Sequence, residues 1–173
     1  MGCEVDDYVM EEFDLGIRNI VLEGDPLLCK KCREVEKFDD RLSNLIDDMI
    51  NTMNKAEGVG LAAPQVGVLR RVAVVNVGDG NIELVNPVIV DSSGEQREEE
   101  GCLSCPGQYA VTLRPMFVTV EAFDRFGKKV KYMGKALKAR AFCHEIDHLD
   151  GILFVDKIIP GTLQYVDPNS EEE

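Results

Sequence analysis

The spacing of apolar residues along the chain predicts two helices. Between 40 and 56 apolar side chains recur every three or four residues, which is the spacing of one helix face, and Gly58 follows as a stop signal. A second helix is predicted over 135–149, and Gly151 closes its pattern. The glycine-rich segment 58–67 interrupts the first pattern. Because its proline restricts the residue before it, we expect an extended loop there.

Four further segments have the short, β-branched or alternating pattern that is typical of strands. They are RVAVVNV (71–77), IELVNPVIV (82–90), MFVTVEAFD (116–124) and KKVKYM (128–133). The links between them are short and contain turn residues, so neighbouring strands are expected to pair antiparallel. This arrangement predicts an α+β fold, with antiparallel sheets packed around the C-terminal helix and a separate helix nearer the N-terminus.

Length and composition predict one domain. The chain has 173 residues, 45% of them hydrophobic, which is enough for one ordinary core. We divide it into an acidic extension (1–16), a single domain (17–160) and a short acidic tail (161–173) that is expected to be disordered. No apolar run approaches the roughly 20 residues of a membrane helix, and the acidic start does not resemble a signal or transit peptide. We therefore expect a protein that stays in the cytoplasm.

The charge distribution limits the range of partners. The net charge is −13, with 32 acidic against 19 basic residues, which argues against a protein that grips nucleic-acid phosphates. Basic residues gather only between 125 and 140, where they are a candidate contact for an acidic partner, although solvated side chains are the expected explanation. The six cysteines are expected to be reduced, since no signal peptide is predicted.

The segment HEIDH (144–148) carries the strongest chemical signal and contains both histidines of the chain. On a helix, residues four apart share a face, so His144 and His148 can bind one metal ion. Glu145 lies beside them and is suited to accept a proton from water at the metal. Asp147 and Asp150 are candidates to accept a hydrogen bond from an imidazole, although a role on the helix surface or as a cap explains both at least as well.

The third metal ligand is not given by this segment. A catalytic metal usually has three protein ligands, and the acidic residue Asp156 is one candidate downstream. Cys102 is favoured by its setting in EEEGCLSCPG, where glycine and proline shape a tight backbone. A thiolate is also a good ligand for Fe²⁺ or Zn²⁺. A zinc site built from the pairs Cys29-x-x-Cys32 and Cys102-x-x-Cys105 is disfavoured, because the pairs are far apart in the sequence.

Three segments together resemble the signature motifs of the peptide deformylase family. GVGLAAPQ (58–65), EGCLS (100–104) and HEIDH (144–148) match G-x-G-L-A-A-x-Q, E-G-C-L-S and H-E-x-D-H in order and spacing. The likeness extends from IRNIVLEGDPLL at 17 to FVDKI at 154. It implies a metal-dependent hydrolase that removes the formyl group from N-formylmethionine of newly made polypeptides. Family members bind one divalent ion, commonly Fe²⁺, which Zn²⁺, Ni²⁺ or Co²⁺ can replace.

The resemblance also implies a role for each matching residue. The implied metal ligands are Cys102, His144 and His148. The implied catalytic groups are Glu145 as general base and acid, with the Gln65 amide and the Leu103 backbone N–H as donors to the oxyanion. We expect Val59, Gly60, Leu137 and Ala141 to contact the methionine and the peptide, although core packing explains these four equally well.

Some features depart from the family pattern. Cys105 stands where the family usually has an aliphatic residue, so a disulfide with Cys102 would empty the metal site, although a buried apolar role is the favoured explanation. The tail lacks the basic helix by which some bacterial members dock on the ribosome, so any transient ribosome contact is assigned to 125–140. Two alternative functions stay open: a generic H-E-x-x-H metallopeptidase, and a non-catalytic metal or redox protein with Cys-x-x-Cys pairs.

Overall fold

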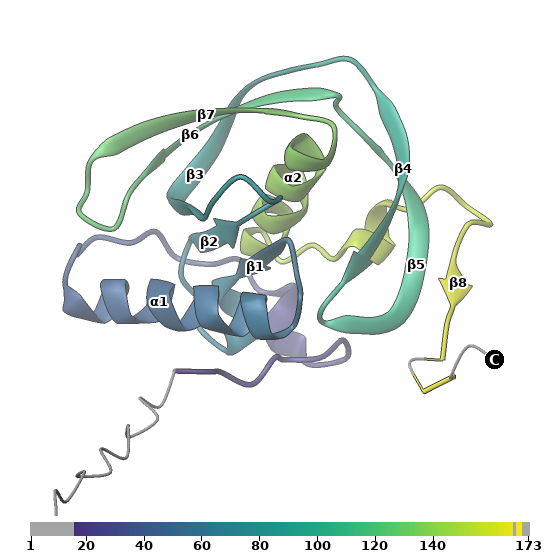
Figure 1. The fold of residues 1–173 in the computed structure, drawn as a ribbon, viewed down its shortest axis with the longest axis horizontal. Helices are drawn as coiled ribbons and strands as arrows, with labels where there is room; N and C mark the ends of the chain where they lie inside the picture. The colour runs from purple at the N-terminus through teal and green to yellow at the C-terminus, as the bar shows by residue number, and fades with distance from the viewer. Residues whose placement is uncertain (1–15, 168, 171–173) are drawn as a thin grey trace, which may run out of the picture.

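The computed structural model describes residues 16–167 and 169–170, so the predicted acidic extension lies almost wholly outside the described residues. The two α-helices and three 3₁₀ helices are α1 (Asp40–Lys55), α2 (Leu137–Leu149), η1 (Pro26–Cys29), η2 (Ala63–Val66) and η3 (Phe154–Lys157). The strands are β1 (Gly60–Ala62), β2 (Val72–Val75), β3 (Ile82–Ser93), β4 (Gln96–Cys102), β5 (Cys105–Arg114), β6 (Phe117–Phe123), β7 (Lys129–Lys135) and β8 (Gln164–Tyr165). Figure 1 shows how they are arranged.

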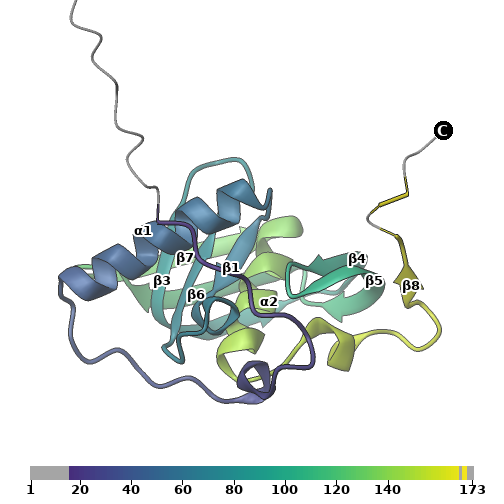
Figure 2. The same cartoon turned by 90° about the horizontal axis from the view of Figure 1, so that it is seen from below.

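Two antiparallel sheets enclose α2. One sheet has the order β1-β2-β3-β6-β7 and the other has the order β4-β5-β8. Helix α2 contacts β1, β2, β6 and β7 of the first sheet and β5 of the second. Seen from below, α1 lies across the first sheet and the β4–β5 hairpin stands to one side (Figure 2). The predicted α+β architecture is therefore confirmed.

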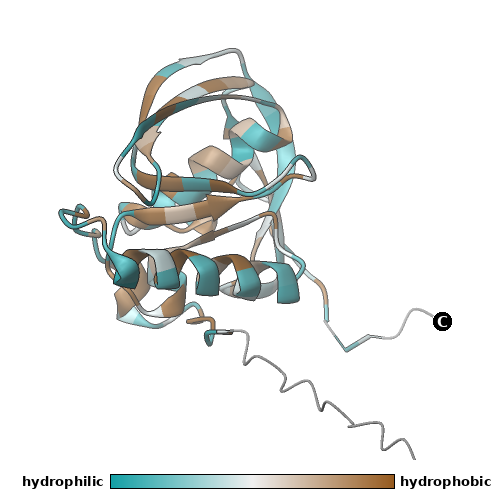
Figure 3. Ribbon diagram, turned by 60° about the vertical axis from the view of Figure 1, so that its left-hand side comes forward, coloured by the Kyte–Doolittle hydropathy of each residue, from teal (hydrophilic) through white to brown (hydrophobic). Residues whose placement is uncertain are grey.

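Helix α1 covers one face of the larger sheet because its apolar residues form a single stripe. Its hydropathy alternates along the ribbon in Figure 3, and the buried side chains include Leu45, Ile46 and Met49. They pack in one cluster with residues of β2 and β3. The Asp39 side chain caps the first turn by accepting the Leu42 N–H at 3.1 Å. The helix that the sequence pattern predicts here is therefore confirmed.

Helix α2 is buried on most of its surface. Ala139, Phe142, Ile146 and Leu149 pack on the inner face of the larger sheet. The helix begins two residues later than predicted, because 135 completes β7 and Ala136 makes a turn with φ of 53°. Because most of its surface packs against the larger sheet, only a narrow strip of α2 can carry polar residues toward the second sheet.

The local structure differs from the sequence-based expectation in three places. The segment 58–67 is not simply a loop, since Gly60–Ala62 pairs with β2 and the following four residues form η2. Strands β4 and β5 were missed because β4 buries only Gln96 and Glu100, so it lacks an alternation of apolar side chains. The predicted disorder of the tail is wrong for Gln164–Tyr165, which pairs with β5.

None of the helices in the described residues combines the length and the apolar character that crossing a membrane would take.

Phe142 offers a test of the packing between α2 and the larger sheet. Its side chain is fully buried, and its ring lies 3.0 Å from where a Cβ of Gly134 would stand, so glycine permits the close approach of β7. Replacing Phe142 by Ala should lower the free energy of unfolding by about 3–5 kcal/mol, measured by urea denaturation. Phe126→Ala, at a site that is 80% exposed, is the control and should change it by less than about 0.5 kcal/mol.

Candidate metal centre

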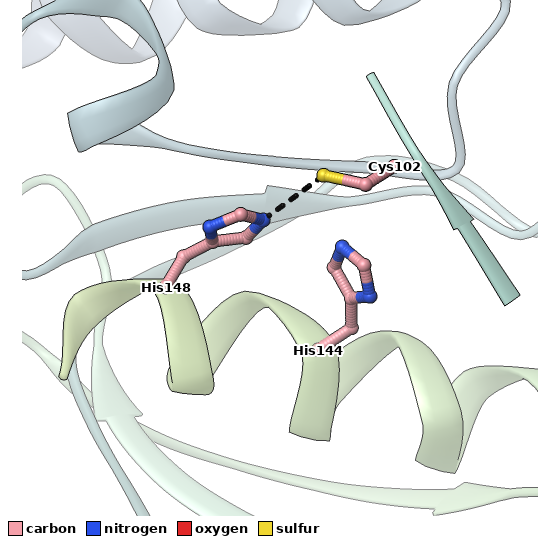
Figure 4. Close-up of side chains that lie close together, drawn as sticks. All are labelled: Cys102, His144 and His148. Carbon is pink, nitrogen blue, oxygen red and sulfur yellow. Dashed lines mark hydrogen bonds between the residues drawn. The ribbon is translucent and has the colours of Figure 1, made fainter. Parts of the chain in front are cut away.

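Two histidines and one cysteine meet between α2 and the end of β4. The three ligand atoms of Cys102, His144 and His148 lie within 4.8 Å of one another. Figure 4 shows the Cys102 sulfur facing both imidazoles, with 3.3 Å between its Sγ and His148 Nε2. The two rings project from successive turns of α2 with their centroids 5.0 Å apart. Cys102 therefore lies where a third ligand beside the two histidines would have to stand.

The backbone of the β4–β5 hairpin turns Cys102 toward the helix. Cys102 pairs with Cys105 across a two-residue turn, and the register shifts between Gly101 and Cys102. Gly107, with φ of 76°, lies in the extra residues of β5 that produce this shift. A Cβ at 101 would stand 2.8 Å from the Tyr109 ring, so glycine lets this ring lie close against the backbone of β4. The result is a bulge that aims the sulfur inward.

A buried carboxylate orients the first histidine. His144 Nδ1 lies 2.9 Å from Glu100 Oε1, and Arg114 binds the same carboxylate through Nε at 2.9 Å and Nη2 at 3.1 Å. The Thr112 hydroxyl also donates to it. Burial alone would raise the pKa of Glu100, but the hydrogen bonds from His144 and Arg114 outweigh it and lower this pKa to about 2. An Nδ1–H donated to this anion leaves His144 Nε2 available for a metal.

The prediction that Asp147 or Asp150 supports an imidazole is wrong. Asp147 accepts from Arg114 Nη1 at 2.7 Å, and Asp150 pairs with Arg71 at 3.0 Å. Glu100 performs this role and was missed, because the sequence does not show which acid of the run 98–100 points inward. Strand alternation, counted from the inward Cys102, would have indicated it.

The acidic alternative for the third ligand is also not supported. Asp156 lies in η3 rather than in a strand, and its carboxylate accepts the Leu153 N–H at 3.3 Å. Cys32 is buried in the cluster between α2 and the larger sheet, whereas Cys105 belongs to a different one. The two Cys-x-x-Cys pairs do not form a common site among the described residues.

Two buried polar atoms at the centre have no hydrogen-bond partner within the described part of the chain, His148 Nδ1 and Glu145 Oε2. Burial lowers the pKa of His148 well below its usual value, so the ring is neutral, as a metal ligand must be. Burial is also the main reason that the pKa of Glu145 rises to about 7. One thiol and two imidazoles fit a divalent transition metal, whose charge would compensate a thiolate in this buried place.

Gln65 is held with its amide nitrogen toward the cysteine. Its Oε1 accepts the Ala62 N–H at 2.9 Å, and its Nε2 donates to Ser104 Oγ at 3.1 Å and lies 3.5 Å from Cys102 Sγ. The side chain is 1% exposed. Because the oxygen is already used, the amide can present only N–H donors to the centre.

An extended N-terminal segment joins the two sides of the centre. The Val21 N–H donates to the backbone oxygen of Gln65 at 2.7 Å. The Glu23 N–H donates to the backbone oxygen of Ser104 at 2.8 Å. One stretch of chain therefore binds both the glutamine and the turn that follows the cysteine.

A cavity of about 450 Å³ opens onto the centre. Its lining includes every predicted substrate contact: Val59, Gly60, Leu137 and Ala141. It also includes five residues with predicted metal-binding or catalytic roles, of which Leu103 acts through its backbone N–H: Gln65, Cys102, Leu103, His144 and Glu145. His148 is 1% exposed and lies behind this lining. A Cβ at Gly60 would stand 2.5 Å from Glu145 Oε1, so glycine lets β1 pass directly over the carboxylate.

Comparison with known proteins decides which family this centre belongs to. The family model for polypeptide deformylase matches residues 17–163. The chain belongs to the polypeptide deformylase family. It is 55% identical over 145 residues to a peptide deformylase of Alkaliphilus metalliredigens, which covers 84% of this chain and 99% of that protein. A peptide deformylase of Acetivibrio thermocellus is also 55% identical, over 84% of this chain and 85% of that one.

Solved structures show the same fold. The peptide deformylase of Legionella pneumophila superposes with a TM-score of 0.81 and 49% identity, covering 83% of this chain and 87% of that chain. That of Thermotoga maritima gives a TM-score of 0.81 with 40% identity, covering 83% and 99%. The predicted family and function are thereby confirmed: the enzyme is a metal-dependent hydrolase that removes the formyl group from nascent polypeptides. The comparisons favour neither alternative function.

Arg114 provides a test of the support behind His144. Arg114→Met would leave the Glu100 carboxylate buried without its cation, so the metal-free protein should lose about 3–5 kcal/mol of unfolding free energy. Arg97→Met is the matched control, because Arg97 is exposed on β4, the strand that pairs with the strand of Arg114. It should cost less than about 0.5 kcal/mol in the same urea titration. Equal losses in the two variants would contradict the assigned role of Arg114.

Glu145 predicts a pH dependence of stability in protein freed of metal by a chelator. Its pKa is about 7 in the folded chain against 4.5 for the ordinary side chain, so the folded state favours the protonated form. The contribution is full below about pH 4.5 and is lost as pH rises through about 7. Relative to Glu145→Gln, the wild type should lose up to about 3 kcal/mol between pH 4.5 and 8. If the difference in unfolding free energy between the wild type and Glu145→Gln stayed constant across this pH range, the raised pKa of Glu145 would be contradicted.

Proposed function

We propose that Cys102, His144 and His148 hold one divalent metal ion, and that the native ion is Fe²⁺. The observation that carries this proposal is the meeting of one thiol and two imidazoles within 4.8 Å, where Cys102 and His144 line a cavity. A thiolate with two imidazoles suits Fe²⁺ and also Zn²⁺, Ni²⁺ or Co²⁺. When bound, the ion supplies Lewis-acid activation of water and of the formyl carbonyl.

Glu145 moves the proton in the proposed mechanism. Its carboxylate is buried beside the metal ligands, and one of its oxygens has no partner within the described residues. A pKa near neutrality lets the group accept a proton from the attacking water and then donate it to the departing amine. Formate and the free N-terminus are the products.

Gln65 and Leu103 hold the oxygen of the formyl group. Attack on the carbonyl carbon builds negative charge on this oxygen, and neutral donors fixed beforehand stabilise it by roughly 3–4 kcal/mol each. The amide of Gln65 is fixed by Ala62 and Ser104, and the Leu103 N–H lies in the two-residue turn next to Cys102. Both donors therefore lie beside the proposed metal position.

The remaining lining residues bind the substrate. Val59 and Leu137 are 44% and 41% exposed at the cavity, whereas Gly60 and Ala141 lie deeper. Apolar walls of this kind suit the methionine side chain, and the exposed pair is placed to contact the peptide that follows.

The proposed setting is the cytoplasm, where the enzyme meets nascent formylated chains. A transient ribosome contact through 125–140 would use basic side chains that have no ion pair within the described part of the chain. The ion pairs in this stretch reduce their number. Arg125 pairs with Asp47 and Glu83, and Lys138 pairs with Asp79. Lys131 also pairs with Glu121, at 3.9 Å. The other exposed lysines of β7 and the preceding turn are then the candidates: Lys128, Lys129 and Lys135.

Formate release from formyl-Met-Ala tests the proposed roles, with protein prepared without oxygen and loaded with Fe²⁺, Ni²⁺ or Zn²⁺. Gln65→Leu should keep its metal and lower kcat by about 10²–10³-fold, since one oxyanion donor is lost. Gln164→Leu, an exposed glutamine on β8, is the control and should behave as the wild type.

Cys102→Ala should bind no metal in an elemental analysis and release no formate. A Cys102→Ala protein that keeps its metal would instead indicate an acidic third ligand. Absence of formate from the loaded wild type would overturn the proposed mechanism.

A further inference from the structure

Cys105 is a buried thiol that the proposed mechanism does not use. Its side chain is 1% exposed and packs with Leu28, Leu153 and Phe154 in a small cluster behind the hairpin. Cys102 packs against the same cluster from the side of the metal centre. The sulfur of the proposed metal ligand therefore has His148 on one side and a second cysteine on the other.

The backbone places the two cysteines at a distance that a disulfide can span. They are cross-strand partners on either side of the turn Leu103-Ser104. Such partners point to the same face of a sheet, with Cα atoms about 4.5–5.5 Å apart, and disulfides join Cα atoms about 4.4–6.8 Å apart.

We propose that Cys102 and Cys105 form a site of reversible oxidative modification, in which a peroxide joins them as a disulfide and the metal ion is released. This inference rests on the proposed role of Cys102 as a metal ligand. Because the disulfide removes the only anionic ligand, two imidazoles remain, and the site no longer offers the three protein ligands of a catalytic metal.

The modification proceeds in two balanced steps. The Cys102 sulfur attacks one oxygen of hydrogen peroxide, so that an S–O bond forms, the O–O bond breaks and one water leaves, giving a sulfenic acid. The Cys105 sulfur then attacks the Cys102 sulfur, so that the S–S bond forms and the oxygen leaves with the Cys105 proton as a second water. Two thiols are oxidised and one peroxide is reduced.

Exposure sets the order of these steps. Cys102 lines the cavity and is reached by a small peroxide, whereas Cys105 is enclosed in its apolar cluster and does not line the cavity. Without Cys105, a sulfenic acid at Cys102 has no resolving thiol and continues to sulfinic and sulfonic acids, which are irreversible. Cys105 thus turns a damaging oxidation into one that a thiol reductant reverses.

The test uses the full chain loaded with Zn²⁺, which has no redox chemistry, so that only thiols are oxidised. Wild type, Cys105→Val and Cys105→Ser are treated with stoichiometric hydrogen peroxide, and zinc release is followed with a chromogenic chelator. Intact mass and a peptide map report the state of each cysteine. Cys29→Ser is the control for peroxide reacting at an exposed thiol.

The wild type and Cys29→Ser should release one zinc per chain and lose two hydrogen atoms in a peptide that links 102 to 105. Dithiothreitol and fresh Zn²⁺ should restore both the zinc content and formate release. The Cys105 variants should gain oxygen at Cys102, and dithiothreitol should restore neither property. If one of these variants fails to fold, the other variant and the wild-type peptide map still show whether Cys105 forms the disulfide with Cys102.

A wild-type map with sulfinic acid at Cys102 and a free thiol at Cys105 would overturn the inference, as would equal reversibility in wild type and Cys105→Val. Either result leaves the metal assignment intact, because zinc is bound before peroxide is added. Failure to bind Zn²⁺ at the start would contradict the metal assignment, and with it the inference that rests on it.

Discussion

The charge pair between Glu100 and Arg114 connects the second sheet to α2, and the centre depends on this connection. Both side chains are more than nine-tenths buried, and the carboxylate touches His144 while the guanidinium touches Asp147. Two residues of the helix, three positions apart, are thereby tied to two adjacent strands. Such a pair adds little net stability over apolar packing, but it allows only one relative placement of its four groups. That placement brings the end of β4 over the histidines.

The parts of the fold that the sequence predicted are those whose burial follows a simple period. Helix α1 has one apolar stripe, and β2, β3, β6 and β7 have β-branched runs, so periodicity located them to within a few residues. Strands β4 and β5 escaped because the two positions that β4 buries are polar. Glu100 is buried against His144 and Arg114, and Gln96 accepts a hydrogen bond from Arg140. The periodicity of apolar residues failed to locate the segment whose inward side chains support the metal centre instead of the apolar core.

The candidate site was predicted more completely than the second sheet that builds it. Motif matching named the thiol, the imidazoles, Glu145 and Gln65, and all of these lie at one centre. The supporting groups were not named, since an acid such as Glu100 differs from its neighbours Glu98 and Glu99 only in the direction of its side chain. Strand alternation indicates that direction only once Cys102 is known to point inward, and the inward position of Cys102 depends on the bulge of the folded hairpin.

The extended segment at Val21 and Glu23 explains why the family match begins at 17, far ahead of the first motif. Its two backbone N–H groups bind the carbonyls behind Gln65 and behind Ser104. The segment 21–23 lies outside the cavity lining, yet it ties the chain at Gln65 to the turn that carries Leu103. A change outside the cavity can therefore alter how the two proposed oxyanion donors stand relative to one another.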